Sequence, residues 1–136
     1  MTDALLAHLA ATSTVTVVTT RRDGTAVATP IWAVVVGDAA YVRAAYGEKT
    51  AWFRRAVSGR PAAFTLADGA RAEQDPVAAL DDPQVAVTFE RVAADNPVQD
   101  AVSAAYEAKY AADFPEHVPP VVSAASLEHT LVVRPA

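Results

Sequence analysis

The sequence of 136 residues contains no cysteine, one methionine and five glycines. Without cysteine the chain forms no disulfide, thiolate metal site, iron–sulfur cluster or cysteine nucleophile. No apolar run approaches the roughly 20 residues that a membrane span requires. The N-terminal residues carry an acid and no basic region, unlike a signal peptide. We therefore expect a cytoplasmic protein with no membrane partner.

Basic residues are scarce as well, because 11 Lys and Arg stand against 16 Asp and Glu, a net charge of −5. A negative overall field disfavours nucleic acid as a partner. His8, His117 and His129 lack the spacing of metal ligands, and no two carboxylates are placed for general acid–base chemistry. The P-loop, the dinucleotide fingerprint and the G-x-S-x-G motif are missing too. We expect no metal site, and the sequence offers no candidate catalytic residue.

Valine is the abundant large apolar residue, with 20 copies against seven leucines and one isoleucine. Because β-branched residues favour strands, we expect a sheet to dominate the core. Hydropathy patterns predict strands at residues 14–21, 25–36, 39–44, 61–66, 84–92 and 130–134, and helices at 3–11, 48–58 and 97–112, with a loop at 114–120. The pairing of residues 68–83 is not predicted. This order indicates one α+β domain, residues 1–136: a small antiparallel barrel of about six strands with flanking helices.

Short local patterns predict where these elements begin and turn. Thr2 is a candidate N-cap, and Asn96 with Gln99 forms a candidate capping box. The pairs Asp23-Gly24 and Gly37-Asp38 predict hairpin turns. Pro30 has no N–H to donate to a ladder, so we expect a bulge or a local sheet edge there.

Residues 31–36 are apolar at every position. A strand of this kind must be covered on both faces. One face can fill a barrel interior, while the other needs a helix, a ligand or a second subunit. We predict that a twofold interface covers it and that the protein is a homodimer.

Five of the 11 basic residues fall between positions 43 and 60, against the single acid Glu48; they are Arg43, Lys49, Arg54, Arg55 and Arg60. A helix start with free N–H groups beside such residues can bind an anion. Residues 46–50 are therefore a candidate phosphate or carboxylate pocket. The alternative is a solvated basic face on an amphipathic helix.

Aromatic residues also allow two interpretations. Trp32 and Trp52 are each more often core residues than ligand contacts, because a tryptophan buries a large area. Tyr106, Lys109 and Tyr110 either form a polar edge of a pocket or pack, with Lys109 extending its amine to solvent.

Several of these features follow one another in a fixed order, namely Arg22-Asp23-Gly24-Thr25, Thr29-Pro30-Ile31-Trp32, Asp38-Ala39-Ala40-Tyr41-Val42-Arg43 and Lys49-Thr50-Ala51-Trp52-Phe53-Arg54-Arg55. The order resembles the front half of the flavin-binding split-barrel proteins, the pyridoxamine-phosphate-oxidase-like and deazaflavin-dependent reductase-like families. The Tyr106-x-x-Lys109-Tyr110 segment and the Leu131-Val132-Val133 strand more closely resemble a small uncharacterised bacterial family within that superfamily.

The resemblance implies a homodimeric split β-barrel that holds FMN or a deazaflavin at the subunit interface. By this resemblance Thr29, Pro30, Ile31 and Trp32 border the ring system, Lys49 and Thr50 hold the phosphate, Arg43 and Arg54 or Arg55 are secondary anion contacts, and Trp52 completes the candidate set. The cofactor would then transfer hydride to or from a small organic substrate.

Two departures from the superfamily keep alternatives open. The chain lacks the further phosphate ligands and the C-terminal Trp/Arg segment of pyridoxamine-phosphate oxidases, which disfavours that reaction. The alternatives are a cofactor-free split barrel that binds or converts a small organic molecule, and a dimeric binding module.

Overall fold

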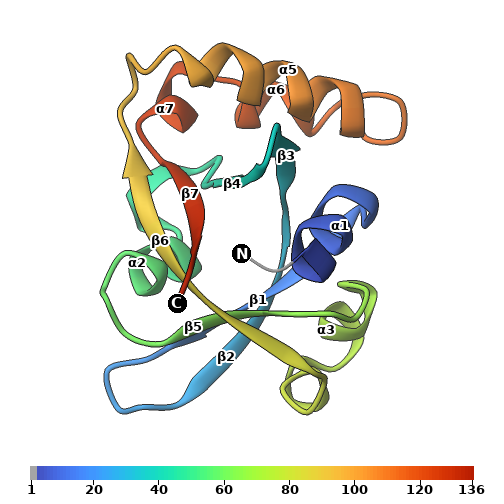
Figure 1. Ribbon diagram of the computed structural model, residues 1–136, viewed down its shortest axis with the longest axis vertical. Helices are drawn as coiled ribbons and strands as arrows, with labels where there is room; N and C mark the ends of the chain where they lie inside the picture. The colour runs from blue at the N-terminus through green and yellow to red at the C-terminus, as the bar shows by residue number, and fades with distance from the viewer. Residues whose placement is uncertain (1–2) are drawn as a thin grey trace.

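The computed structural model describes residues 3–136 and consists of one curled antiparallel sheet with helices around it (Figure 1). The strands are β1 (Thr14–Thr20), β2 (Ala26–Trp32), β3 (Val34–Val36), β4 (Ala39–Arg43), β5 (Ala62–Thr65), β6 (Gln84–Val92) and β7 (Thr130–Pro135). The helices are α1 (Asp3–Ala11), the 3₁₀ turn η1 (Gly47–Lys49), α2 (Ala51–Ala56), α3 (Ala70–Gln74), α4 (Pro76–Ala79), α5 (Val98–Tyr110), α6 (Val118–Val121) and α7 (Ala124–Leu127). The predicted N-cap Thr2 lies outside the described residues.

The predicted α+β class and antiparallel sheet are confirmed, and the sheet forms a half-barrel of seven strands rather than about six. The difference arises because the strand predicted at residues 25–36 is interrupted at Ala33. Its first part, β2, pairs with β1, and its second part, β3, pairs with β4. In the strand order β2-β1-β5-β6-β7-β4-β3 these two parts lie at opposite ends. The sheet therefore curls until its two ends meet near Ala33.

Pro30 lies on the edge strand β2, opposite Thr16 on β1. The predicted sheet edge is confirmed. Of the two alternatives, a bulge or an edge, only the edge is observed, because the pairing of β1 and β2 runs without interruption through this position. An edge strand tolerates proline since the side without a partner needs no N–H.

Both predicted hairpin turns are present. Val36 pairs with Ala39, so Gly37-Asp38 forms the two-residue turn that was expected. The other hairpin closes at the pair Thr20 and Ala26, which leaves a five-residue loop around Asp23-Gly24.

The apolar residues 31–36 alternate between two hydrophobic clusters. Ile31, Ala33 and Val35 pack into the barrel interior with β1, β4 and β7. Trp32, Val34 and Val36 pack against the cluster that α5 contributes. Both faces of this run are thus covered within one chain. The sequence left a helix, a ligand or a second subunit open for the outer face, and the structure has a helix, α5, there. The apolar run needs no second subunit, so the homodimer stays a prediction that must rest on other grounds.

Lys109 and Tyr110 explain why the long strand breaks at Ala33. The Tyr110 hydroxyl accepts a hydrogen bond from the Ala33 N–H at 3.2 Å and donates to Ser13 O at 2.5 Å. The Lys109 amine donates to Ala33 O at 2.7 Å and to Leu9 O at 2.8 Å. Because the peptide groups of Ala33 bond to α5 rather than to a neighbouring strand, the ladder stops there. Of the two interpretations of this segment, packing of the tyrosines is the one observed. The expectation that Lys109 extends its amine to solvent is wrong, because the amine bonds to these two backbone oxygens.

Two predictions about helices and one about a loop need correction. Residues 48–58 form η1 and α2, because Thr50 between them has an extended backbone. Asn96 does cap α5, accepting a hydrogen bond from Val98 N at 2.9 Å. The capping box is wrong, since Asn96 N donates to Ala93 O at 3.0 Å and the side-chain oxygen of buried Gln99 accepts from Arg43 instead. The segment predicted as a loop at residues 114–120 contains the start of α6.

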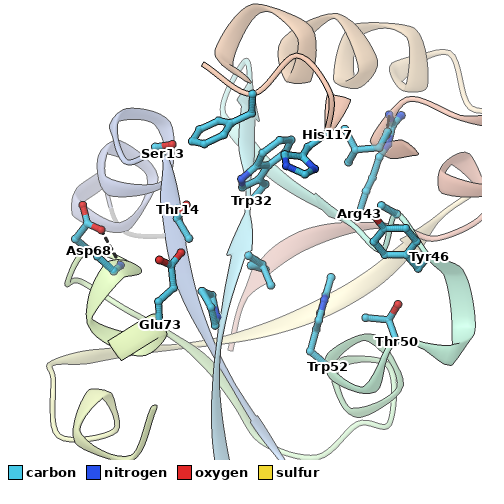
Figure 2. A pocket seen from close by; sticks show the side chains of 16 residues that line it. Ser13, Thr14, Trp32, Arg43, Tyr46, Thr50, Trp52, Asp68, Glu73 and His117 are labelled. Atoms are coloured by element: carbon cyan, nitrogen blue, oxygen red, sulfur yellow. Dashed lines mark hydrogen bonds between the residues drawn. The ribbon is translucent and has the colours of Figure 1, made fainter. Parts of the chain in front are cut away.

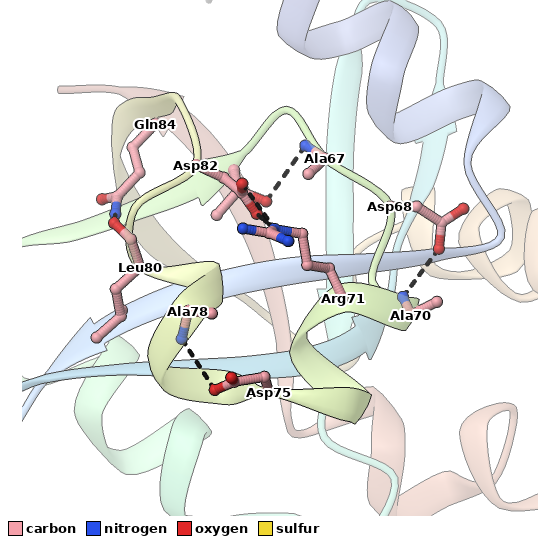
Figure 3. A network of polar contacts seen from close by, with 10 residues as sticks. Ala67, Asp68, Ala70, Arg71, Asp75, Ala78, Leu80, Asp82 and Gln84 are labelled. Carbon is pink, nitrogen blue, oxygen red and sulfur yellow. Dashed lines mark hydrogen bonds and ion pairs between the residues drawn. The ribbon is translucent and has the colours of Figure 1, made fainter.

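Residues 68–83, whose pairing was not predicted, form the short helices α3 and α4 (Figure 3). Asp75 caps α4 by accepting from Ala78 N at 3.0 Å. Arg71 pairs with Asp82 at 2.8 Å and joins the two ends of the segment. Both helices pack over β2, where Ala72 and Ala79 are buried. Within residues 3–136, no helix has both the length and the hydropathy needed to cross a membrane.

Candidate functional site

A cavity of about 630 Å³ lies between the barrel and the short helices (Figure 2). Five parts of the chain meet there: the start of β1, the end of β2, the β4–α2 connection, α3 and the segment after α5. Its lining consists of Ser13, Thr14, Pro30, Ile31, Trp32, Arg43, Ala45, Tyr46, Thr50, Trp52, Asp68, Ala70, Glu73, Phe114, His117 and Val121. A volume of this size lies within the usual range of about 300–1,000 Å³ for small-molecule sites.

Six of the nine residues predicted as cofactor contacts line this cavity, namely Pro30, Ile31, Trp32, Arg43, Thr50 and Trp52. The other three, Thr29, Lys49 and Arg54, are outside its lining. Arg54 is exposed on α2. The structure thus brings together the two segments that the sequence predicted around positions 30 and 50, although nearly 20 residues separate them.

Aromatic side chains form much of the wall. Trp32 stacks on Tyr110 with ring centroids 4.0 Å apart and an interplanar angle of 4°. Contact with Tyr110 on one face therefore fixes the orientation of the Trp32 ring. Trp52 is 8% exposed and meets Phe53 edge-on, which makes it both a core residue and a lining residue. Tyr46, in contrast, is 79% exposed. Phe114 completes the aromatic set. Such walls suit a flat conjugated ligand, because rings stack on rings.

Arg43 reaches the cavity from the end of β4, but its side chain is committed to the protein. It is 4% exposed, and each of its five N–H groups meets a neutral acceptor. The acceptors are Thr130 Oγ1, Ser103 Oγ, Val121 O, Gln99 O and Gln99 Oε1. Burial lowers the pKa of Arg43. This arginine therefore contributes positive potential to the cavity wall, and no N–H is left to donate to a ligand.

Two carboxylates lie across the cavity from Arg43. Asp68 and Glu73 project from the α3 side, whereas Arg43 and Tyr46 lie on the opposite side (Figure 2). Asp68 also accepts a hydrogen bond from Ala70 N at 2.9 Å. The cavity is consequently polarised, with acid at one side and the buried arginine at the other. These two acids were not predicted as site residues, since they belong to the segment whose pairing was not predicted. The acidic composition of that segment was the signal that could have indicated them.

Lys49 lies in a second hollow of about 730 Å³, beside the cavity and sharing Tyr46 with it. Here Arg91 and Glu48 form an ion pair at 3.2 Å. The Lys49 amine makes no hydrogen bond or ion pair with any residue that the structure describes, so it is available to an anion. The helix expected to supply N–H groups, α2, has only six residues and begins at Ala51. Any anion site at residues 46–50 thus depends on Lys49 and not on a helix terminus.

Metal binding has little support in the described part of the chain. Among residues 3–136, no group of three or more His, Asp or Glu side chains is placed to hold an ion. Of the three histidines, only His117 lines the cavity.

The fold and the cavity define an α+β protein built on a curled antiparallel half-barrel with an aromatic-walled cavity. The chain belongs to the family DUF2255, described as an uncharacterized protein conserved in bacteria, whose model matches residues 5–133. No curated protein and no solved structure matches the chain. The expected membership of an uncharacterised bacterial family is therefore confirmed, and the relationship to flavin-binding split barrels stays a prediction.

Proposed function

We propose that the cavity binds the ring system of FMN or a deazaflavin and that the protein is a small oxidoreductase. One observation carries the proposal: Pro30, Ile31 and Trp32 line the same aromatic-walled cavity as Thr50 and Trp52. The resemblance assigns both sets of residues to one cofactor. When bound, the cofactor would supply the hydride chemistry. No side chain then has to act as a nucleophile or strong base.

The residues of this chain would bind and orient the ring. Trp32 is held by its stack on Tyr110 and Trp52 by its burial, so both present fixed surfaces. Rigid walls lose little conformational entropy when a ligand binds. The hydroxyls of Ser13, Thr14 and Thr50 are among the polar groups available for the ring edge.

The cofactor's phosphate fits less directly, because the charged lining residues are Asp68, Glu73 and the fully bonded Arg43. In this proposal the phosphate extends past Tyr46 into the neighbouring hollow and meets Lys49. Lys49→Ala should then raise the Kd about ten- to hundredfold, since a charge-assisted contact contributes about 1.5–3 kcal/mol. Arg134→Gln is the matched control, because it removes an exposed charge that pairs with Glu90 elsewhere. An unchanged Kd for Lys49→Ala would place the phosphate elsewhere.

The proposal is tested by titrating the protein into FMN and into a deazaflavin and following cofactor fluorescence. We expect the fluorescence of one of the two cofactors to be quenched. The Kd should be higher for Trp32→Leu than for Trp32→Phe, because phenylalanine keeps a flat ring. If both cofactors retain their fluorescence and absorbance at high protein concentration, the redox proposal is overturned.

A cofactor-free binding site is the second candidate, and the acids favour it. Asp68 and Glu73 repel a phosphate-bearing ligand and suit a neutral or cationic aromatic molecule. Binding of a cationic aromatic dye that weakens in Glu73→Gln, without binding of either cofactor, would select this alternative. The homodimer implied by the resemblance is checked by light scattering at micromolar concentration, where a strictly monomeric mass contradicts it.

A further inference from the structure

Four arginines meet at the end of β1, away from the cavity. Arg21 follows β1, Arg54 and Arg55 belong to α2, and Arg60 precedes β5. Burial lowers the pKa of Arg55, and the charges of Arg21, Arg54 and Arg60 lower it further. The guanidinium groups of Arg21, Arg54 and Arg60 thus each act electrostatically on that of Arg55. None of them lines the cavity.

Two of these arginines are held in place by neighbouring residues of β1. Arg55 donates from Nε to Thr19 Oγ1 at 2.8 Å, and Arg60 donates from Nε to Thr20 O at 2.7 Å. Both side chains are half-buried. Each bond uses the inner nitrogen of the guanidinium, which leaves the two outer nitrogens of each group without a protein acceptor among the described residues. Two guanidinium groups are thus anchored at successive residues of β1 with their outer nitrogens free.

No acid within residues 3–136 forms an ion pair with these four arginines. The arginines that do form ion pairs are Arg71, Arg91 and Arg134. Asp23 lies on the same hairpin as Arg21, but it is fully exposed and its carboxylate accepts a hydrogen bond from Thr25 N at 2.9 Å. The cluster accordingly concentrates positive charge in a chain whose net charge is −5.

We propose that Arg21, Arg54, Arg55 and Arg60 form a binding site for a phosphate group, either free or as a monoester. Planar guanidinium forks match the oxygens of a tetrahedral oxyanion and bind them in a bidentate manner. Like charges at close range are unfavourable, and a bound dianion relieves this repulsion. The site is independent of the proposed flavin site, because the two share no lining residue.

The proposal is tested by isothermal titration with inorganic phosphate and, in a second arm, with phenyl phosphate, at constant ionic strength set by sodium chloride. We expect saturable binding and a rise in Tm with phosphate that chloride does not produce. Arg60→Gln and Arg54→Gln should weaken binding at least tenfold. The Arg54 side chain is exposed and makes no hydrogen bond with other described residues, and its backbone N–H bonds to Thr50 O, so replacement of the side chain does not compromise folding. Arg134→Gln should bind phosphate like the parent protein.

Three other results would each overturn the proposed phosphate site. Equal Tm shifts with phosphate and chloride would mean that the arginines only respond to ionic strength. Phosphate binding that survives in the double variant Arg54→Gln/Arg60→Gln would place the anion elsewhere. Binding of phenyl phosphate without inorganic phosphate would show that the aromatic ring, and thus the cavity, is recognised instead. Failure of the flavin titrations leaves all these readouts unchanged.

Discussion

The rings of Trp32 and Tyr110 lie parallel, 4.0 Å apart, and so join the last residue of β2 to the last residue of α5. One side of Trp32 is fixed by this stack, and the residue also lines the cavity. The same tyrosine bonds through its hydroxyl to Ala33 N and Ser13 O. Barrel closure and cavity wall therefore depend on one side chain.

Tyr110→Phe should keep the stack and destabilise the protein by about 1–3 kcal/mol, because it leaves Ala33 N–H and Ser13 O without their partner. Urea unfolding measures the difference. Tyr106→Phe is the matched control on the same helix, since the Tyr106 hydroxyl is buried with no hydrogen-bond partner among the described residues. That variant should change the stability by less than about 1 kcal/mol. Equal losses in both variants would contradict the role assigned to the Tyr110 hydroxyl.

Burial lowers the pKa of Lys109 from 10.5 to about 8. Between these two values the unfolded chain binds more protons than the folded one at this residue, so the free energy of unfolding should rise with pH above about 8. Burial also raises the pKa of Tyr106 and Tyr110 above 10.0, which lowers stability again once tyrosines of the unfolded chain ionise. We expect a stability maximum near pH 9–10, given roughly by these values.

The measurement is urea unfolding from pH 7 to pH 11, with Lys109→Met as the control. Methionine has no charge, so the rise between about pH 8 and pH 10 should disappear while the decline at higher pH persists. A rise of the same size in Lys109→Met would assign it to another group.

Arg43→Met should destabilise the protein by about 3 kcal/mol or more, because it deprives several buried oxygens of their donor. The resemblance treats Arg43 as an anion contact, whereas its five hydrogen bonds go to the protein. Arg91→Met is the control: its ion pair with Glu48 is exposed and contributes less than about 1 kcal/mol. Thermal unfolding distinguishes the two. A fully stable Arg43→Met would show that the network is dispensable.

Gly69→Ala should destabilise the protein by about 1–3 kcal/mol, as overpacking does. A Cβ at this position would lie 2.6 Å from the Thr14 carbonyl oxygen, and Gly69 N donates to that same oxygen at 2.8 Å. Because Thr14 and Asp68 both line the cavity, ligand affinity should fall as well. An unchanged unfolding midpoint would mean that α3 moves away from β1 at no cost.

Local sequence patterns predicted much of this fold for physical reasons. The alternation in β1 and β6, the Gly37-Asp38 turn and the periodicity of α5 each depend on residues a few positions apart. The two-sided apolar run at residues 31–36 also predicted correctly that both faces are covered. For the site, the sequence predicted six lining residues, because the resemblance gathered segments that local patterns could not connect.

The sequence by itself determined where strands, turns and the long helix form, since those depend on neighbouring side chains and backbone geometry. Only the tertiary structure decided that the long strand breaks at Ala33, because the groups that bond there, Lys109 and Tyr110, lie more than 70 residues away. It also decided that Gln99 serves Arg43 rather than a helix cap, and that Asp68 and Glu73 face a cavity. A buried donor or acceptor takes whichever partner the packed chain brings within reach, and that choice is made by contacts distant in sequence.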